Sequence, residues 1–259
     1  MTAEILEWNK KLKEPFKKLH FLEEDHKYWV EGDPRKITSV STLLKFFYDE
    51  FDTETEAIKW AESRNLPVEM VLSAWTGEGD RANSHGSAVH LVGERYLDYK
   101  FLGKGTCPQP IDKQSLGAIQ FLEDLPDYLI PVASELQMYS ERYWYSGTAD
   151  IILLNLRNKK LVIADYKTNK ALTDPYPKGL LYHVNPKYGL KQDNFGKYTG
   201  QFSFYQILLE EAGFEVQSRV LVHLKEDKPK KKLYRTFKTE NVTEDLRHWL
   251  NLGMHLTKN

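Results

Sequence analysis

Cysteine is almost missing from this chain of 259 residues. The single cysteine, Cys107, excludes an intrachain disulfide and a cysteine-based zinc or iron–sulfur site, which suits a reducing compartment. Long apolar runs are missing too, because no stretch approaches the length of a membrane-spanning helix. Residues 1–18 mix acids with lysines and lack the apolar core of a signal peptide. We therefore expect a cytoplasmic protein with no membrane partner.

An excess of one charge is the third absence. The chain has 36 Lys plus Arg and 37 Asp plus Glu, for a net charge of −1. Such a balance gives no general attraction to nucleic acid, so a polyanionic partner must be held by a local patch or through a metal. The hydrophobic fraction of 41% and the charged fraction of 28% are those of an ordinary globular protein with one large core.

The order of predicted elements indicates an α+β protein. The pattern predicts a hairpin within 19–32, a helix capped by Ser39 or Ser41, helical structure over 54–75, a Gly-, Asn- and Ser-rich loop over 76–86, and helices over 87–99 and 115–125. Strands follow from Val132, and then come a long polar loop over 171–199, a helix capped by Thr199 and ended by Gly213, a lysine-tipped hairpin and a terminal helix. Hairpins without regular β-α-β alternation predict a mixed central sheet flanked by helices.

Two of the predicted strands place an aspartate at neighbouring ends of a hairpin. Asp150 precedes the apolar run 151–154, and Asp165 follows the run 161–164. A turn centred between residues 157 and 158 would set these aspartates opposite each other, with Cβ atoms about 4.5–5.5 Å apart and charges that repel. Alternation along the strand puts Lys167 on the face of Asp165 and Tyr166 on the other face. Either Lys167 alone neutralises the pair, or a divalent cation bridges it; a surface ion pair at a strand end is the plainer alternative.

Four further residues are candidates for the same site. His90 shares a helix face with Gly86 and Gly93, which suggests that something approaches this face closely; a histidine of the core is the alternative. Glu135 is either another carboxylate for the same cation or a polar residue on a solvated strand face. Gln201 and Tyr205 lie on one side of a helix, where the alternative is a core tyrosine beside a surface glutamine.

The order of these residues resembles a known pattern. The stretches are GSAVH ending at His90, then Glu135, GTAD ending at Asp150, DYKT beginning at Asp165, and QFSFY ending at Tyr205. This arrangement resembles the RecB-like branch of the PD-(D/E)XK nuclease superfamily over residues 81–225. The upstream ITSVSTLL further resembles the phage and mitochondrial genome-maintenance exonuclease group. Ala149 replaces the proline that names the motif, and the cysteines of the iron–sulfur members are missing, so no iron–sulfur cluster is expected.

The resemblance implies a fold and a metal site. The fold is a restriction-endonuclease-like core over 81–259, with an N-terminal hairpin and helical region over 1–80 packed over the active site. Mg²⁺ or Mn²⁺ would be held by His90, Asp150, Asp165 and the backbone carbonyl of Tyr166. The remaining catalytic roles implied are Glu135 binding a second metal or supporting the first, Lys167 orienting or deprotonating the attacking water, and Gln201 with Tyr205 steadying the substrate phosphate and the lysine.

The function implied is that of a metal-dependent deoxyribonuclease. We expect an exonuclease that acts on single-stranded DNA ends in replication, recombination or repair. Its partners would be proteins of those processes. If a phage encodes it, it would act in the host cytoplasm. The alternatives are an endonuclease or flap nuclease on the same core, and a nuclease-dead DNA-binding subunit. Basic and aromatic residues alternate in the long loop in a way that suits a single strand, although a solvated loop is the plainer alternative: Lys170, Tyr176, Lys178, Tyr182, Lys187, Tyr188, Lys191 and Lys197. The lysine-rich hairpin tip over 228–232 is a DNA contact or a protected edge.

Overall fold

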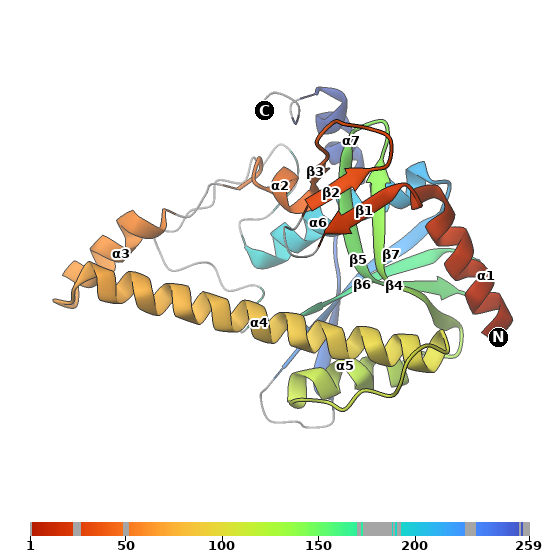
Figure 1. The fold of residues 1–259 in the computed structure, drawn as a ribbon, viewed down its shortest axis with the longest axis horizontal. Coiled ribbons are helices and arrows are strands. Elements are labelled where there is room, and N and C mark those ends of the chain that lie inside the picture. The colour runs from red at the N-terminus through yellow and green to blue at the C-terminus, as the bar shows by residue number, and fades with distance from the viewer. Residues whose placement is uncertain are drawn as a thin grey trace.

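A mixed six-stranded sheet forms the centre of the protein (Figure 1). The structure is a computed structural model that describes residues 2–22, 27–48, 52–169, 172, 188, 190, 193–225, 232–253 and 255. The strands of the sheet are β3 (Thr38–Ser39), β4 (Leu129–Ser140), β5 (Tyr145–Asn155), β6 (Leu161–Lys167), β7 (Val216–Leu224) and β8 (Tyr234–Lys238). The pairs β3–β5 and β6–β7 are parallel and the other pairs are antiparallel. The predicted mixed sheet of an α+β protein is confirmed, and it is consistent with a restriction-endonuclease-like core.

The register of the β5–β6 hairpin is the predicted one. Ile152 pairs with Ile163, and Leu154 pairs with Leu161. Strand β4 pairs along one edge of β5. On the other edge, β3 pairs with residues 145–146 of β5, and β6 pairs with residues 151–154. Residues 147–150 of β5 therefore lie in a gap between two partner strands. This gap leaves room beside β5 for side chains from neighbouring elements.

Helices cover both faces of the sheet (Figure 1). Helix α4 (Val68–Phe101) packs against β4 and β5, and α5 (Lys113–Glu123) packs against α4, β7 and β8. Helix α6 (Asn194–Glu211) connects β6 to its parallel neighbour β7 and packs with α2 (Val40–Leu44) and α7 (Thr243–Asn251). The N-terminal elements α1 (Thr2–Lys13), η1 (Glu14–Phe16) and β1 (Leu19–Leu22) lie beside β4, and β2 (Lys27–Val30) pairs with β1.

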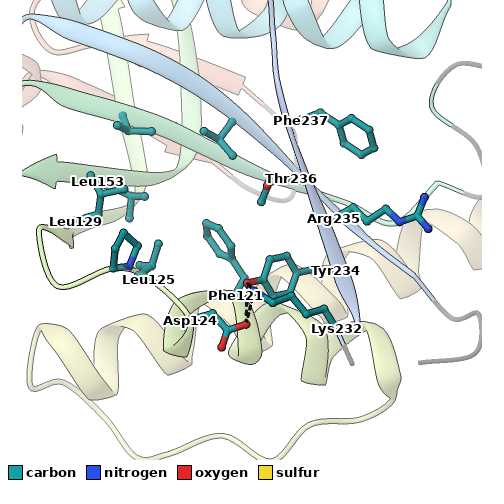
Figure 2. A pocket seen from close by; sticks show the side chains of 13 residues that line it. Phe121, Asp124, Leu125, Leu129, Leu153, Lys232, Tyr234, Arg235, Thr236 and Phe237 are labelled. Atoms are coloured by element: carbon teal, nitrogen blue, oxygen red, sulfur yellow. Dashed lines mark hydrogen bonds and ion pairs between the residues drawn. The ribbon is translucent and has the colours of Figure 1, made fainter. Parts of the chain in front are cut away.

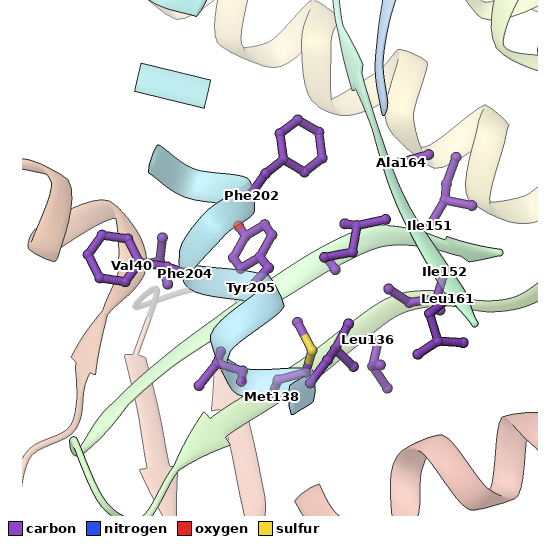
Figure 3. Packing of buried hydrophobic residues seen from close by; sticks show 14 of the residues in the cluster. Val40, Leu136, Met138, Ile151, Ile152, Leu161, Ala164, Phe202, Phe204 and Tyr205 are labelled. Atoms are coloured by element: carbon purple, nitrogen blue, oxygen red, sulfur yellow. The ribbon is translucent and has the colours of Figure 1, made fainter. Parts of the chain in front are cut away.

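The side chains of α6 pack into the main core (Figure 3). Phe202 and Phe204 are buried, as are Leu136 on β4 and Ile152 on β5. Burial of such side chains contributes about 1.5–3 kcal/mol each, so this contact fixes α6 firmly on the sheet. Asp193 caps the helix by accepting a hydrogen bond from Gly196 N. The α6 side chains therefore have a rigid support.

The predicted loop over 76–86 is wrong, because these residues belong to α4. This helix has 34 residues, which corresponds to a length of about 50 Å. Its first part projects from the sheet with α3 (Thr53–Glu62), and the two helices share a small separate core of Ala57, Ala61 and Val71 (Figure 1). Packing at both ends holds the intervening segment helical, although each of its glycines costs about 1 kcal/mol relative to alanine.

Other boundary predictions have mixed outcomes. Ser39 caps α2, and Gly213 follows the C-terminus of α6 with φ +87°, both as predicted. Thr199 is not a cap, since α6 begins at Asn194 and the Thr199 hydroxyl donates to Phe195 O within the helix. The proposed division of the chain at residue 80 falls inside α4 and stays a prediction. Among the described residues, none of the helices combines the length and apolarity needed to cross a membrane.

Two glycines of α4 give a matched test of this packing. A Cβ at Gly93 would lie 2.6 Å from Tyr166 Cε2, whereas a Cβ at Gly79 would have nothing within 4 Å. We expect Gly93→Ala to lower the free energy of unfolding by about 1–3 kcal/mol through overpacking. Gly79→Ala should leave it unchanged or raise it by up to about 1 kcal/mol. Urea unfolding measures both, and equal effects of the two substitutions would contradict the close crossing at Gly93.

Candidate active site

Three acidic residues occupy neighbouring positions on three adjacent strands. On β4 and β5, the pairs Ser134↔Ile151 and Leu136↔Ala149 flank Glu135 and Asp150, which places these two opposite each other. On β5 and β6, the pair Ile151↔Ala164 makes Asp150 and Asp165 the next positions. The three carboxylates therefore form a row across the sheet. We call Glu135, Asp150 and Asp165 the carboxylate row.

His90 reaches this row from α4. Its Nδ1 lies 3.0 Å from Asp150 Oδ2. Helix α4 can cross close to β6 because Gly93 leaves room for the Tyr166 ring, and Gly86 lies against Thr168, where an added Cβ would be 3.4 Å from Oγ1. The predicted close approach is confirmed at Gly93, whereas the contact at Gly86 is an ordinary van der Waals one. His90 can thus contact Asp150 because Gly93 lets α4 come close to β6.

Tyr166 ties the strand to the helices. Its ring packs edge-on to His90 and to Phe121, and its hydroxyl donates to Ala118 O at 3.3 Å. Its backbone N–H donates to Asp150 Oδ2 at 3.2 Å. Tyr166 therefore points toward α4 and α5, while Lys167 pairs with Asp165, as strand alternation predicts.

A metal-ligand set is present in this cluster. One ligand atom from each of His90, Glu135 and Asp150 lies within 4.8 Å of the other two. Imidazole and carboxylate ligands suit a divalent cation such as Mn²⁺ or Mg²⁺. Asp165 does not belong to this set, and its side chain, 3% exposed, is paired with the Lys167 ammonium. The residues present fit a divalent cation at His90, Glu135 and Asp150.

The protonation of the row reflects burial and, after it, crowded negative charge. Burial, and then the neighbouring Asp150 and Glu94, raise the pKa of Glu135 to about 8. Burial, and then Asp150, raise the pKa of Asp165 to about 6. Burial alone would also raise the pKa of Asp150, but His90 and Lys167 hold it below its usual value. The row therefore retains protons near neutral pH that a bound cation would displace.

The two cationic side chains are stabilised in their charged forms. Burial disfavours the charge on His90, but Asp150 outweighs it and raises the pKa of His90 to about 9. For Lys167, burial is likewise outweighed by Asp165 and Asp150, so its pKa is raised. Because two cations face three carboxyl groups, Glu135 keeps a proton near neutral pH.

Glu135 also has an unusual backbone. Its φ of 44° lies in the left-handed region, which a non-glycine residue within a strand rarely adopts. Such conformations cost about 1–3 kcal/mol and persist where the surroundings enforce them, often at functional sites. The β4 member of the carboxylate row is thus held in a backbone conformation that costs free energy.

Gln201 and Tyr205 form a pair on α6. Gln201 Nε2 donates to Tyr205 Oη at 2.8 Å, which confirms that they share one side of the helix. The Tyr205 ring lies against β5, where a Cβ at Gly147 would be 2.6 Å from it. Burial, and then Asp165, raise the pKa of Tyr205, so its hydroxyl stays protonated beside the row.

Three residues near the site were not found from the sequence. Tyr28 Oη lies 2.8 Å from Thr148 Oγ1, and Glu94 lies close enough to Glu135 to affect its pKa. The ring of Tyr198 lies over the Lys167 ammonium. Glu94 is one helical turn after His90, so helical spacing alone could have found it. Tyr198 was missed because the start of its helix was placed after it.

The predicted basic and aromatic strip is only partly described. Lys170, Tyr176, Lys178, Tyr182, Lys187 and Lys191 lie outside the described residues, as does most of the lysine-rich tip over 228–232. Tyr188 is 4% exposed and packs edge-on to Phe47, so the expectation that it stacks on a base is wrong. Lys232 pairs with Asp124. Of the predicted loop lysines, Lys197 is described, on α6.

A cavity in the described part of the chain lies away from this site (Figure 2). Its volume is about 530 Å³, and its lining includes Phe121, Leu129 and Phe237 but no member of the carboxylate row. Two of its charged residues, Asp124 and Lys232, pair with each other, and Asp124 also accepts from Tyr234 Oη. The cavity therefore adds no group to the candidate site.

The raised pKa of Glu135 predicts a pH-dependent stability. The pKa of Glu135 is about 8 in the folded protein and 4.5 in its ordinary state. Its protonated form therefore stabilises the fold fully below pH 4.5, and this stabilisation is lost as the pH rises to 8. In EDTA, the melting temperature of Glu135→Gln minus that of the wild type should therefore be larger at pH 8 than at pH 5. Thermal melts at both pH values test this. A difference that does not change with pH would show that the pKa of Glu135 is not raised in the folded protein.

The chain was compared with protein-family models, curated proteins and solved structures. No protein-family model and no curated protein matches the chain. Similar solved structures include SSO0001, 16% identical, with a TM-score of 0.39 over 100% of this chain and 88% of its own. They also include a "Putative exonuclease" from Eubacterium rectale, 16% identical, with a TM-score of 0.38 over 85% of this chain and 79% of its own. At these TM-scores the likeness says nothing about the site.

Proposed function

We propose that the protein is a metal-dependent deoxyribonuclease of the RecB-like PD-(D/E)XK type. The observation that supports this most is the carboxylate row on β4, β5 and β6, with His90 at one side and Lys167 paired to Asp165 at the other. The same residues carry the sequence resemblance. Chemistry on a phosphodiester needs positive charge beside a water that can be deprotonated, and this cluster could supply both.

The cation would be Mg²⁺ or Mn²⁺. His90, Glu135 and Asp150 are close enough to hold it, and the resemblance adds Asp165 and the carbonyl of Tyr166. When bound, a divalent cation lowers the pKa of water and neutralises charge that develops on phosphorus. An imidazole ligand favours Mn²⁺ in affinity, whereas oxygen ligands also suit Mg²⁺.

The chain's own residues have separate roles in this proposal. Lys167 keeps its proton, so it would orient the attacking water and stabilise negative charge on the phosphoryl oxygens. Tyr205, whose hydroxyl accepts from Gln201, would donate a hydrogen bond to a substrate phosphate.

Basic residues next to the cluster support a polyanionic substrate. Burial lowers the pKa of Lys197, and the nearby Lys167 and Lys45 lower it further. Lys45 and Lys197 come together because α2 and α6 are in contact, with Leu44 packed against Gly200. Crowded lysines favour binding of phosphate groups. We propose a single DNA strand with a free end, consistent with the exonuclease group that the sequence resembles and with roles in replication, recombination or repair.

One assay tests the activity and the need for an end. Labelled circular single-stranded DNA and its linearised form are incubated with the protein and Mg²⁺ or Mn²⁺. We expect degradation of the linear form only, with loss of activity in EDTA. Lys167→Met should lower the rate by about 10²–10³ and still melt at a higher temperature with Mn²⁺, whereas Lys18→Met, at an exposed lysine, should behave as wild type.

The outcomes separate the alternatives. Equal cleavage of circular and linear DNA would favour an endonuclease. A protein that binds DNA but cuts neither form in Mg²⁺ or Mn²⁺ would be the nuclease-dead subunit. Since a cation at about 100 times its dissociation constant adds roughly 2.7 kcal/mol of stability, the absence of any Mn²⁺-dependent rise in melting temperature would contradict the metal site itself.

A further inference from the structure

The Lys167 ammonium lies between two partners of different kinds. One is the Asp165 carboxylate, with which it forms an ion pair. The other is the ring of Tyr198 on α6, whose centroid is 4.6 Å from Lys167 Nζ. Only 14% of the lysine side chain is exposed, so little water competes with these partners. A cation within about 6 Å of an aromatic centroid is attracted to the ring face, and more strongly where water is excluded.

The Tyr198 ring is itself fixed in place. Its hydroxyl donates to Asn169 Oδ1 at 2.6 Å, and Asn169 follows Lys167 by two residues. The carbonyl of Asn169 accepts from His223 Nε2 at 2.6 Å on the neighbouring strand β7. The ring is thus attached both to the rigid helix α6 and to the segment that carries the lysine.

The two partners of Lys167 respond differently to a cation. A carboxylate in the row attracts both a divalent ion and the ammonium, so the ion weakens the hold of Asp165 on the lysine. The Tyr198 ring is neutral and offers a hard cation no good ligand, and it therefore keeps its attraction for the ammonium. When a divalent cation is bound, the Tyr198 ring therefore supplies a larger share of the attraction that holds the Lys167 ammonium in place.

We propose that Tyr198 is a positioning residue for Lys167. Its ring face holds the ammonium beside the carboxylate row when a divalent cation draws on the row's negative charge. The activity of Lys167 in this statement rests on the proposed nuclease function. The contact between ring and ammonium does not, and it can be measured without any substrate.

The central experiment is a double-mutant cycle of Tyr198→Leu and Lys167→Met. The unfolding equilibrium of the four proteins is measured by urea denaturation, in EDTA and in saturating Mn²⁺. We expect the pair to be coupled in both conditions, by a factor of roughly three to ten in the unfolding constant, with the larger factor in Mn²⁺. If Tyr198 served packing alone, the two substitutions would be additive. Additivity in Mn²⁺ would overturn the proposal, whether or not the protein cuts DNA.

Two further variants separate the ring from the hydroxyl and from general effects. Tyr198→Phe keeps the ring and loses the bond to Asn169, so the coupling to Lys167 should persist. Tyr99→Leu removes an exposed tyrosine of α4 and should show no coupling. If Tyr198→Leu does not fold, Tyr198→Gln takes its place in the same cycle.

Kinetics then test the role of the contact. In a wild type that cuts DNA, Tyr198→Leu should lower kcat about tenfold with KM within about twofold, because the lysine acts after binding. Tyr198→Phe should restore most of kcat. A wild-type kcat in Tyr198→Leu would overturn the positioning role while leaving the nuclease function intact. An inactive wild type with a coupled pair would instead contradict the proposed function alone.

Discussion

The register of three strands sets three carboxylates side by side, and the chemistry of the site depends on that crowding. Glu135, Asp150 and Asp165 lie at neighbouring positions on β4, β5 and β6 because the pairing on either side of them allows no other placement. Opposed like charges destabilise a sheet. Burial adds to this cost, since buried charges need compensating partners. Burial, and then this repulsion, raise the pKa values of Glu135 and Asp165.

The rest of the architecture brings positive charge to the row. Helix α4 crosses close enough for His90 to contact Asp150, and this distance depends on Gly93 beneath the Tyr166 ring. Strand β6 supplies Lys167 two residues after Asp165, and α6 places an aromatic ring over its ammonium. Two cations still face three carboxyl groups, so Glu135 keeps its proton near neutral pH, and a bound divalent cation would displace that proton. Sheet, helix crossing and aromatic contact thus serve one electrostatic requirement.

Much of this site could be predicted from periodicity. The hairpin register followed from two apolar runs of matching length, and alternation placed Lys167 with Asp165 and apart from Tyr166. The glycines on the face of His90 indicated a close approach, and strand β6 makes that approach through Tyr166. These features are local, so the sequence pattern records them directly.

The errors arise where tertiary contacts override local preference. Residues 76–86 contain several poor helix formers, yet packing at both ends of α4 keeps them helical. The left-handed turn at Glu135 and the burial of Tyr188 against Phe47 depend on partners far away in the chain. Tyr198 was missed for a related reason, because Asp193 caps α6 about one and a half turns before the expected start.

The most direct test of the carboxylate row as a metal site is a crystal grown with Mn²⁺ and measured at a wavelength where manganese scatters anomalously. The account predicts an anomalous peak at ligand distance from His90, Glu135 and Asp150, the residues whose ligand atoms already lie within 4.8 Å of one another. An Asp150→Asn crystal under the same conditions should lose most of that peak. A wild-type crystal saturated with Mn²⁺ but without density at these three side chains would contradict the central claim.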